Sequence, residues 1–201
     1  AFALSTVYGQ VPSMVMSPVE GDLIIKGDGH PDLITSGVYK GACNNTTGFW
    51  SFCQPQSVLD THTSTSGIGG ADDTYAWDIN YFDRTKEPQQ SVYAVADGEI
   101  VTSGSWDKST YNQVLLKHTD TNGNIWYSGY LHMDQVISKT AGKFVSAGTV
   151  LGNISDKGAS GNTHLHFAVY ALENSKYVSK NTTIIPRITF NPGNNLNFNQ
   201  P

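Results

Sequence analysis

Cysteine is scarce in this sequence: the chain of 201 residues contains only Cys43 and Cys53. They lie close together in a stretch rich in Asn, Thr, Gly and aromatic residues, where a disulfide would close a short loop and contribute roughly 2–3 kcal/mol. The alternative, a pair of metal ligands, lacks the usual spacing and a second Cys or Cys/His pair. We therefore expect a Cys43–Cys53 disulfide, which indicates an oxidising compartment.

Charge and long apolar runs are also lacking. Charged residues make up 14% of the chain, and the net charge of −5 without any Lys/Arg cluster argues against a nucleic-acid binder. No apolar run approaches the ~20 residues that a membrane helix requires, so we expect no membrane span. Plentiful Gly, Ser, Thr, Asn and Tyr are typical of secreted β-proteins, and we expect an extracellular or periplasmic location.

The first residues, Ala1 to Ser5, lack an initiator Met and the basic start of a signal peptide. We expect a processed end here, and the sequence leaves open whether a signal peptide or a propeptide was removed or the chain was trimmed. The length allows a sizeable core without support from a metal or a disulfide. Stability is therefore no reason to expect a zinc ion.

Short strand patterns and turn residues run through the chain, without an internal repeat and without a convincing amphipathic helix of more than about two turns. The clearest hairpin joins residues 112–119 to residues 125–133 through Asp120-Thr121-Asn122-Gly123-Asn124. Residues 91–104 and 143–154 each contain two more strand-like runs. These patterns predict an all-β or β-dominated fold with an antiparallel sheet.

The stretch from Gly161 to Tyr170 carries the strongest functional signal. In a β-strand, alternate side chains share a face, so His164, His166, Ala168 and Tyr170 would lie opposite Leu165, Phe167 and Val169. The apolar face can anchor the strand, which leaves two imidazoles on a rigid element facing a groove. This arrangement suits a metal site, although a pair of histidines alone does not separate ligands from coincidence.

A second strand, over residues 75–82, would place Ala76, Asp78 and Asn80 on one face. A carboxylate surrounded by Tyr, Trp, Ile and Phe is costly to desolvate unless it meets a cation or a full set of hydrogen-bond donors. Asp78 is thus a candidate metal ligand.

In their order and residue sequence, five motifs resemble those of the lysostaphin-like zinc endopeptidases, which cut peptidoglycan cross-bridges and stem peptides. The resemblance covers roughly residues 62–170 and rests on Tyr75-Ala76-Trp77-Asp78-Ile79, Val92-Tyr93-Ala94-Val95-Ala96-Asp97-Gly98-Glu99-Ile100-Val101, Tyr130-Leu131-His132-Met133, Val145-Ser146-Ala147-Gly148-Thr149-Val150-Leu151-Gly152 and Ser160-Gly161-Asn162-Thr163-His164-Leu165-His166-Phe167. It implies a lysostaphin-like peptidase core with one zinc ion (Zn2+) in a groove.

By this resemblance, Asp78 and His166 are zinc ligands, and His132 and His164 flank a zinc-activated water. Two histidines and one carboxylate would leave a fourth tetrahedral position open, as catalytic zinc requires. One neutral imidazole can accept a proton from the water, and the other can stabilise the oxyanion. Which of the two is the general base stays open.

The remaining ligand in the family is a histidine that precedes the aspartate. We assign His62, which lies before a Gly-rich run at a somewhat longer spacing than expected, and not His30, which lies much farther upstream. If no upstream histidine is bound, the site would resemble those of relatives that bind or activate rather than cut.

Other candidates receive structural roles. We expect His118 to be structural and the pair Asp72-Asp73 to lie in a solvated loop, because it lacks the regular spacing of oxygen ligands in a calcium site. The side chains of Asn112, Trp126, Tyr127 and Tyr130 could line a groove or form the core of the hairpin, and both interpretations stay open.

Three segments follow: an N-terminal segment (1–60) that packs on or precedes the core, a metallopeptidase core (61–172) and a C-terminal extension (173–201). We expect a monomeric zinc metalloendopeptidase that hydrolyses peptide bonds of peptidoglycan, or of a Gly-rich protein. The alternatives are a catalytically silent relative that binds peptidoglycan or regulates a hydrolase, and a lectin-like β-sandwich with incidental histidines. The sequence does not indicate which bond is cut, the organism or the role of residues 1–60.

Overall fold

The computed structural model describes residues 10–20, 23–25, 49–51, 68–81, 85–104, 112–136, 141–161 and 163–187. Its strands are β1 (Met14–Glu20), β2 (Leu23–Ile25), β3 (Phe49–Ser51), β4 (Trp77–Tyr81), β5 (Ser91–Tyr93), β6 (Gly98–Gly104), β7 (Gln113–Thr119), β8 (Ile125–Leu131), β9 (Met133–Asp134), β10 (Phe144–Val145), β11 (Val150–Ile154), β12 (Leu165–Glu173), β13 (Lys176–Ser179) and β14 (Thr183–Arg187). Two short 3-10 turns, η2 (Ile68–Gly70) and η3 (Glu87–Gln89), are the helical elements in this described part. The predicted β-dominated fold is confirmed.

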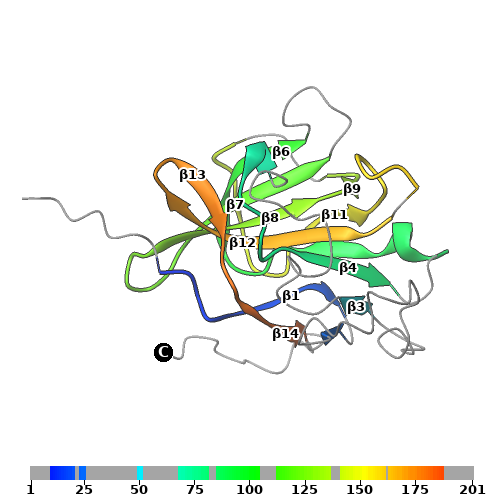
Figure 1. Ribbon diagram of the computed structural model, residues 1–201, viewed down its shortest axis with the longest axis horizontal. Helices are drawn as coiled ribbons and strands as arrows, with labels where there is room; N and C mark the ends of the chain where they lie inside the picture. Colours follow the sequence, from blue (N-terminus) through cyan, green and yellow to red (C-terminus); the bar gives the residue numbers. More distant parts are fainter. Residues whose placement is uncertain are drawn as a thin grey trace, which may run out of the picture.

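A nine-stranded sheet forms the body of the molecule (Figure 1). Its order is β10-β6-β7-β8-β12-β4-β3-β2, and β13 also pairs with β12. All neighbours in it are antiparallel except β2 and β3. The predicted hairpin is present as β7 and β8, which pair antiparallel from Val114 opposite Tyr130 to Thr119 opposite Ile125.

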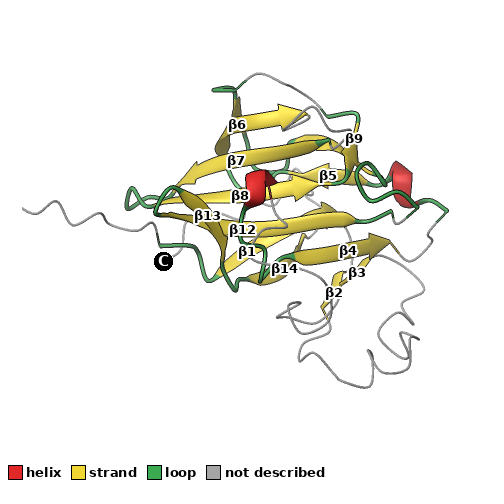
Figure 2. Ribbon diagram, turned by 45° about the horizontal axis from the view of Figure 1, so that its top comes forward, coloured by secondary structure: helices red, strands yellow, loops and turns green. Residues whose placement is uncertain are grey.

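Strand β12 lies in the middle of this sheet, between β8 and β4 (Figure 2). The register places His166 opposite Leu131 of β8 and opposite Asp78 of β4. Side chains that face each other across neighbouring strands lie on the same side of a sheet. The pairing therefore brings the two candidate ligands of the sequence analysis side by side.

Hydrophobic residues cover both faces of β12. Leu165, Phe167 and Val169 belong to the main core, as the alternation predicts. Ala168 and Tyr170, on the histidine face, belong to a second cluster that includes Ile68 of η2. The end of the histidine face that carries Ala168 and Tyr170 is therefore packed against this second cluster.

The aromatic residues of the hairpin belong to these cores. Trp126 and Tyr130 lie in the main core and Tyr127 in the second cluster, with 5%, 0% and 8% of their surface exposed. The interpretation of these three side chains as groove-lining is wrong, and the hairpin-core interpretation is correct. These rings are buried because hydrophobic clusters lie on both faces of the sheet at this hairpin, and aromatic side chains gain from apolar burial.

Two smaller sheets complete the described fold. Strands β5, β11 and β9 form a three-stranded sheet, and β1 pairs with β14 in parallel. Arg187 ties these elements together, because its side chain donates to the carbonyl oxygens of Ser17 (3.0 Å) and Ala94 (2.9 Å). The first and last described segments are thus held against the core, and the segment boundaries at residues 60 and 172 remain predictions.

No helix among the described residues is long and apolar enough to cross a bilayer.

Candidate metal centre

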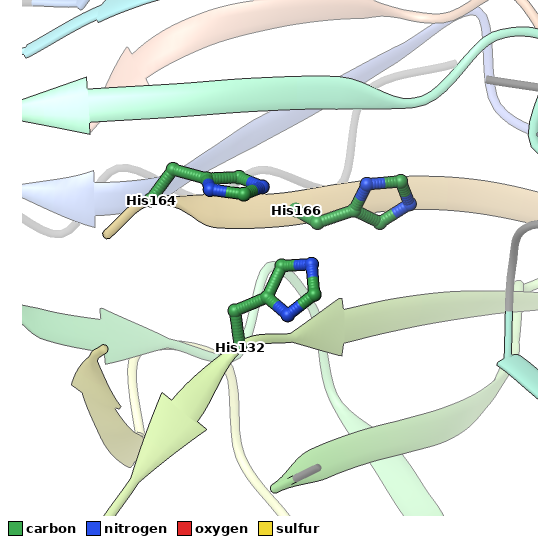
Figure 3. A group of neighbouring side chains, drawn as sticks. All are labelled: His132, His164 and His166. Carbon is green, nitrogen blue, oxygen red and sulfur yellow. The ribbon is translucent and has the colours of Figure 1, made fainter. Parts of the chain in front are cut away.

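Three histidines converge at the N-terminal end of β12 (Figure 3). His132 lies between β8 and β9, His164 forms an isolated bridge with Ser155 just before β12, and His166 lies within β12. One nitrogen atom of each ring lies within 4.8 Å of one nitrogen of each other ring. The ring centroid of His132 lies 4.6 Å from that of His164 and 5.9 Å from that of His166.

His132 is held in an unusual backbone conformation. Its φ of 59° lies in the left-handed region, which a residue with a Cβ seldom adopts and which concentrates at functional sites. Ser155 stabilises this turn, because its backbone nitrogen and its Oγ donate to the His132 carbonyl at 2.8 and 3.0 Å. The chain thereby leaves β8 with the imidazole directed toward the other two rings (Figure 3).

The tautomer of His132 follows from its hydrogen bond. Its Nδ1 lies 2.8 Å from the carbonyl oxygen of Lys157, and a carbonyl can only accept, so Nδ1 carries the proton. Burial, followed by the charges of His166 and His164, lowers the pKa of His132 to about 4. At neutral pH the ring is therefore neutral, with its lone pair on Nε2.

Asp78 lies beside the cluster, as the sequence predicts. Its Oδ1 is 3.1 Å from Nδ1 of His166 and 3.4 Å from Nε2 of His164. Asn80, two residues further along the same face of β4, donates to the carbonyl of Thr163 at 3.0 Å and so fixes the entry of the chain into His164. The sheet register and this bond together bring Asp78 to both histidines of β12.

Asp73 does not lie in a solvated loop, and that prediction is wrong. Its side chain is fully buried, with Oδ2 2.5 Å from Nε2 of His166 and Oδ1 accepting from the hydroxyl of Tyr170 at 2.6 Å. Its neighbour Asp72 does fit a turn, since its Oδ1 accepts from the backbone and the hydroxyl of Thr74. The missed signal is on β12, where a tyrosine hydroxyl and an imidazole on one buried face require an acceptor.

His166 is thus enclosed by two carboxylates. Burial acts to lower its pKa, but the charge of Asp73 and the hydrogen bonds to Asp73 and Asp78 outweigh that effect and raise it to about 10. A buried imidazole with a strongly perturbed pKa and specific charged partners is typical of functional sites. Two negative groups around one imidazole also make this end of the strand attractive to a cation.

Several predicted residues lie outside the described part of the chain. They are the proposed upstream ligand His62, its competitor His30, and the cysteines of the expected disulfide, Cys43 and Cys53. The assignment of His62 and the Cys43–Cys53 disulfide therefore remain predictions. His118 is described, and it contacts Asp97 and Ser128 rather than the three-histidine cluster.

The described residues fit a zinc ion chemically. Imidazole nitrogen and carboxylate oxygen are standard zinc donors, and a catalytic site uses three protein ligands with one open position. His166 and Asp78 present such donors at adjacent positions of two paired strands. Rigid strands suit a preorganised ligand set.

The model of peptidase family M23 matches residues 79–180, which is more than half of the chain. The chain belongs to peptidase family M23. The lysostaphin-like resemblance is thereby confirmed, and the family supports the assignment of the protein as a peptidase. The matched region contains all three clustered histidines and begins directly after Asp78, so Asp73 and Asp78 lie just outside it.

Solved structures to which this chain is similar include the catalytic domain of the antimicrobial peptidase lysostaphin from Staphylococcus simulans. It is 25% identical with a TM-score of 0.42, over 57% of this chain and 79% of that domain. A zinc-containing peptidase from Vibrio cholerae is 19% identical with a TM-score of 0.42, over 70% of this chain but only 36% of its own length. A chain of the SpoIIIAH and SpoIIQ complex is 16% identical with a TM-score of 0.40, over 89% of this chain and 95% of that chain. No curated protein matches the sequence significantly.

Proposed function

We propose that this member of family M23 is a zinc-dependent endopeptidase that hydrolyses peptide bonds in bacterial peptidoglycan, in its cross-bridges or stem peptides. The observation that carries the proposal is the convergence of His132, His164 and His166 beside Asp78 at one end of the central strand. The family supplies the reaction class, and the donor set supplies the metal. A Gly-rich protein is the alternative substrate of the same chemistry.

Asp78 and His166 would hold the metal, with His62 as the third protein ligand. When bound, zinc activates a water and polarises the scissile carbonyl. The carboxylate of Asp78 would hold the metal from β4, and the imidazole of His166 would hold it from β12. The pairing of these two strands fixes the position of one donor relative to the other.

The two other histidines take different roles in this proposal. His132 holds its proton on Nδ1 against the Lys157 carbonyl, so its Nε2 is the nitrogen that can accept a proton from the attacking water. His164 has Nε2 3.4 Å from the Asp78 carboxylate, an arrangement that suits a nitrogen carrying a proton. We assign His132 as the general base and His164 as the donor that stabilises the oxyanion.

Metal analysis of the full chain, purified without added zinc, tests the proposal together with the release of new amino groups from purified cell walls. We expect about one zinc per chain, amino-group release by the wild type, and none above background by His164→Ala. Asp78→Asn, which alters a proposed zinc ligand, should weaken zinc binding. Asp72→Asn is its control, because Asp72 contacts Thr74. Zinc without amino-group release would indicate the silent relative, and absence of zinc binding would overturn the proposal.

A further inference from the structure

The two ring nitrogens of His166 face different carboxylates. Nδ1 lies 3.1 Å from Oδ1 of Asp78, and Nε2 lies 2.5 Å from Oδ2 of Asp73. These nitrogens lie on different edges of a planar imidazole, so the two carboxylates lie on different sides of the ring. Asp78 is on the side of the histidine cluster, and Asp73 is behind the ring, where its exposed fraction is 0%.

A second side chain of β12 fixes the other oxygen of Asp73. Tyr170 lies four residues after His166 on the same strand face, and its hydroxyl donates to Oδ1 at 2.6 Å. Burial and the charge of Asp73 raise the pKa of Tyr170 well above its usual value, so the hydroxyl keeps its proton and remains a donor. Each oxygen of the buried carboxylate thus has a hydrogen-bond partner, as a charge in a dry site requires.

The backbone around Asp73 is also pinned. Asp72 forms an isolated bridge with Val178 of β13, the carbonyl of Asp73 accepts from Ala76 at 2.9 Å, and the nitrogen of Tyr75 donates to Oγ of Ser179 at 2.9 Å. Because β13 pairs directly with β12, the loop that carries Asp73 is anchored to the strand whose histidine it contacts. Asp73 is therefore preorganised rather than free to swing away.

The ring of Tyr170 has no room to move. A Cβ built on Gly129 of β8 would lie 2.7 Å from Cε2 of Tyr170 and 2.9 Å from Cδ1 of Ile68, which is closer than real contacts allow. Glycine at this position lets the ring approach β8 closely, with the hydroxyl within hydrogen-bond distance of Asp73. Packing against Gly129 and the hydrogen bond to Asp73 thus favour the same position of the Tyr170 side chain.

We propose that Asp73 and Tyr170 are positioning residues that hold the proton of His166 on Nε2 and so present the Nδ1 lone pair to the metal beside Asp78. A carboxylate can only accept, so each ring nitrogen that faces one can carry a proton. Binding of a metal beside Asp78 would displace the proton of Nδ1, while the hydrogen bond to Asp73 retains the proton of Nε2. Hydrogen bonding at one imidazole nitrogen commonly sets which nitrogen binds a metal. This inference rests on the proposed zinc site and adds to it two residues that do not bind the metal.

Zinc affinity tests the positioning role, measured on the full chain by competition with a chromophoric chelator. We expect Asp73→Asn, which keeps the shape but removes the charge, to weaken zinc binding by about 10- to 100-fold. Tyr170→Phe removes one hydrogen bond and should weaken it by about 3- to 10-fold. The matched control Asp72→Asn should bind zinc as the wild type does.

The tautomer itself gives a readout on the wild-type protein, and a variant is used only to assign its signals. In the zinc-loaded wild type with 15N-labelled histidine, long-range 15N–1H correlation spectra should show His166 protonated on Nε2 and not on Nδ1. The His166 signals are identified by their loss in His166→Gln. A proton on Nδ1 would overturn the inference, whatever the variants show.

The outcomes separate this inference from the function on which it rests. If the wild type binds no zinc, or binds it equally well after Asp78→Ala, the proposed metal site is wrong. If zinc binding requires Asp78 and His166 but is unchanged in folded Asp73→Asn and in Tyr170→Phe, only the positioning role is wrong. Near-ultraviolet circular dichroism and thermal unfolding establish which variants are folded.

Discussion

His118 and His166 are both buried histidines of the central sheet, on β7 and β12 with β8 between them, and their surroundings give them opposite properties. His118 stacks on Trp126 at 4.0 Å and meets a carbonyl of Asp97 and the hydroxyl of Ser128, each at 2.7 Å. Burial lowers the pKa of His118 to about 4, whereas the carboxylates around His166 raise the pKa of His166 to about 10, although both side chains are buried. Charged partners, and not depth alone, separate a structural histidine from a functional one.

The polar network around His118 is complete with a neutral ring. Nδ1 donates to Asp97, while Ser128 Oγ lies within hydrogen-bond distance of both Nε2 and the hydroxyl of Tyr130. The Tyr130 hydroxyl in turn accepts from the backbone nitrogen of Val95 at 3.0 Å. A network with every group paired makes the core rigid and leaves no donor for a metal.

The largest effect should come from removing a metal donor on the His166 side. We expect His166→Ala and Asp78→Ala to lose zinc at stoichiometric concentrations and to release no measurable amino groups from cell walls. The loss should exceed about 100-fold, because removing even an outer partner of a ligand costs about 10- to 100-fold. Asp72→Asn should retain both properties, and zinc retained by His166→Ala would contradict the assignment.

Loss of His132 should separate chemistry from metal binding. In our assignment this residue moves a proton and holds no metal, so His132→Ala should lower kcat by about 100- to 10,000-fold while the zinc affinity changes little. Steady-state kinetics on a soluble peptide substrate, combined with zinc titration, measure both. An equal loss in both quantities would instead make His132 a ligand.

Part of the fold and of the site can be predicted from the sequence, and part cannot. The period-2 alternation of residues 164–170 and the turn at 120–124 predict β12 and the hairpin correctly, because both are local patterns. Asp78 is found because a carboxylate in an apolar strand requires a partner. Asp73 is missed because its burial depends on the bridge between Asp72 and Val178, a contact across about a hundred residues that no local pattern encodes.

Acid should lower the free energy of unfolding through His118. Because the pKa of His118 is lower in the folded chain than the ordinary 6.5, the unfolded chain takes up a proton first. This contribution to stability is complete above about pH 6.5 and is lost as the pH falls toward 4, by up to about 3 kcal/mol. Urea unfolding at pH 7 and pH 4.5 measures it.

His118→Gln is the reference for that measurement. It cannot titrate, so its free energy of unfolding should fall less between the two pH values than that of the wild type, although it starts from a lower value at pH 7. Parallel pH dependence in both proteins would show that His118 is not the group responsible.

The smallest effects should come from one methyl group added beside His118 and one added beside Tyr170, the partner of Asp73. A Cβ at Gly98 would lie 2.7 Å from Nδ1 of His118, whereas a Cβ at Gly129 would press on Tyr170. Overpacking of this kind costs about 1–3 kcal/mol, so Gly98→Ala and Gly129→Ala should both unfold at lower urea concentrations. Only Gly129→Ala should also weaken zinc binding, because it displaces the ring that holds Asp73 against His166. Equal zinc affinity in the two folded variants would mean that the packing of Tyr170 does not reach the metal site.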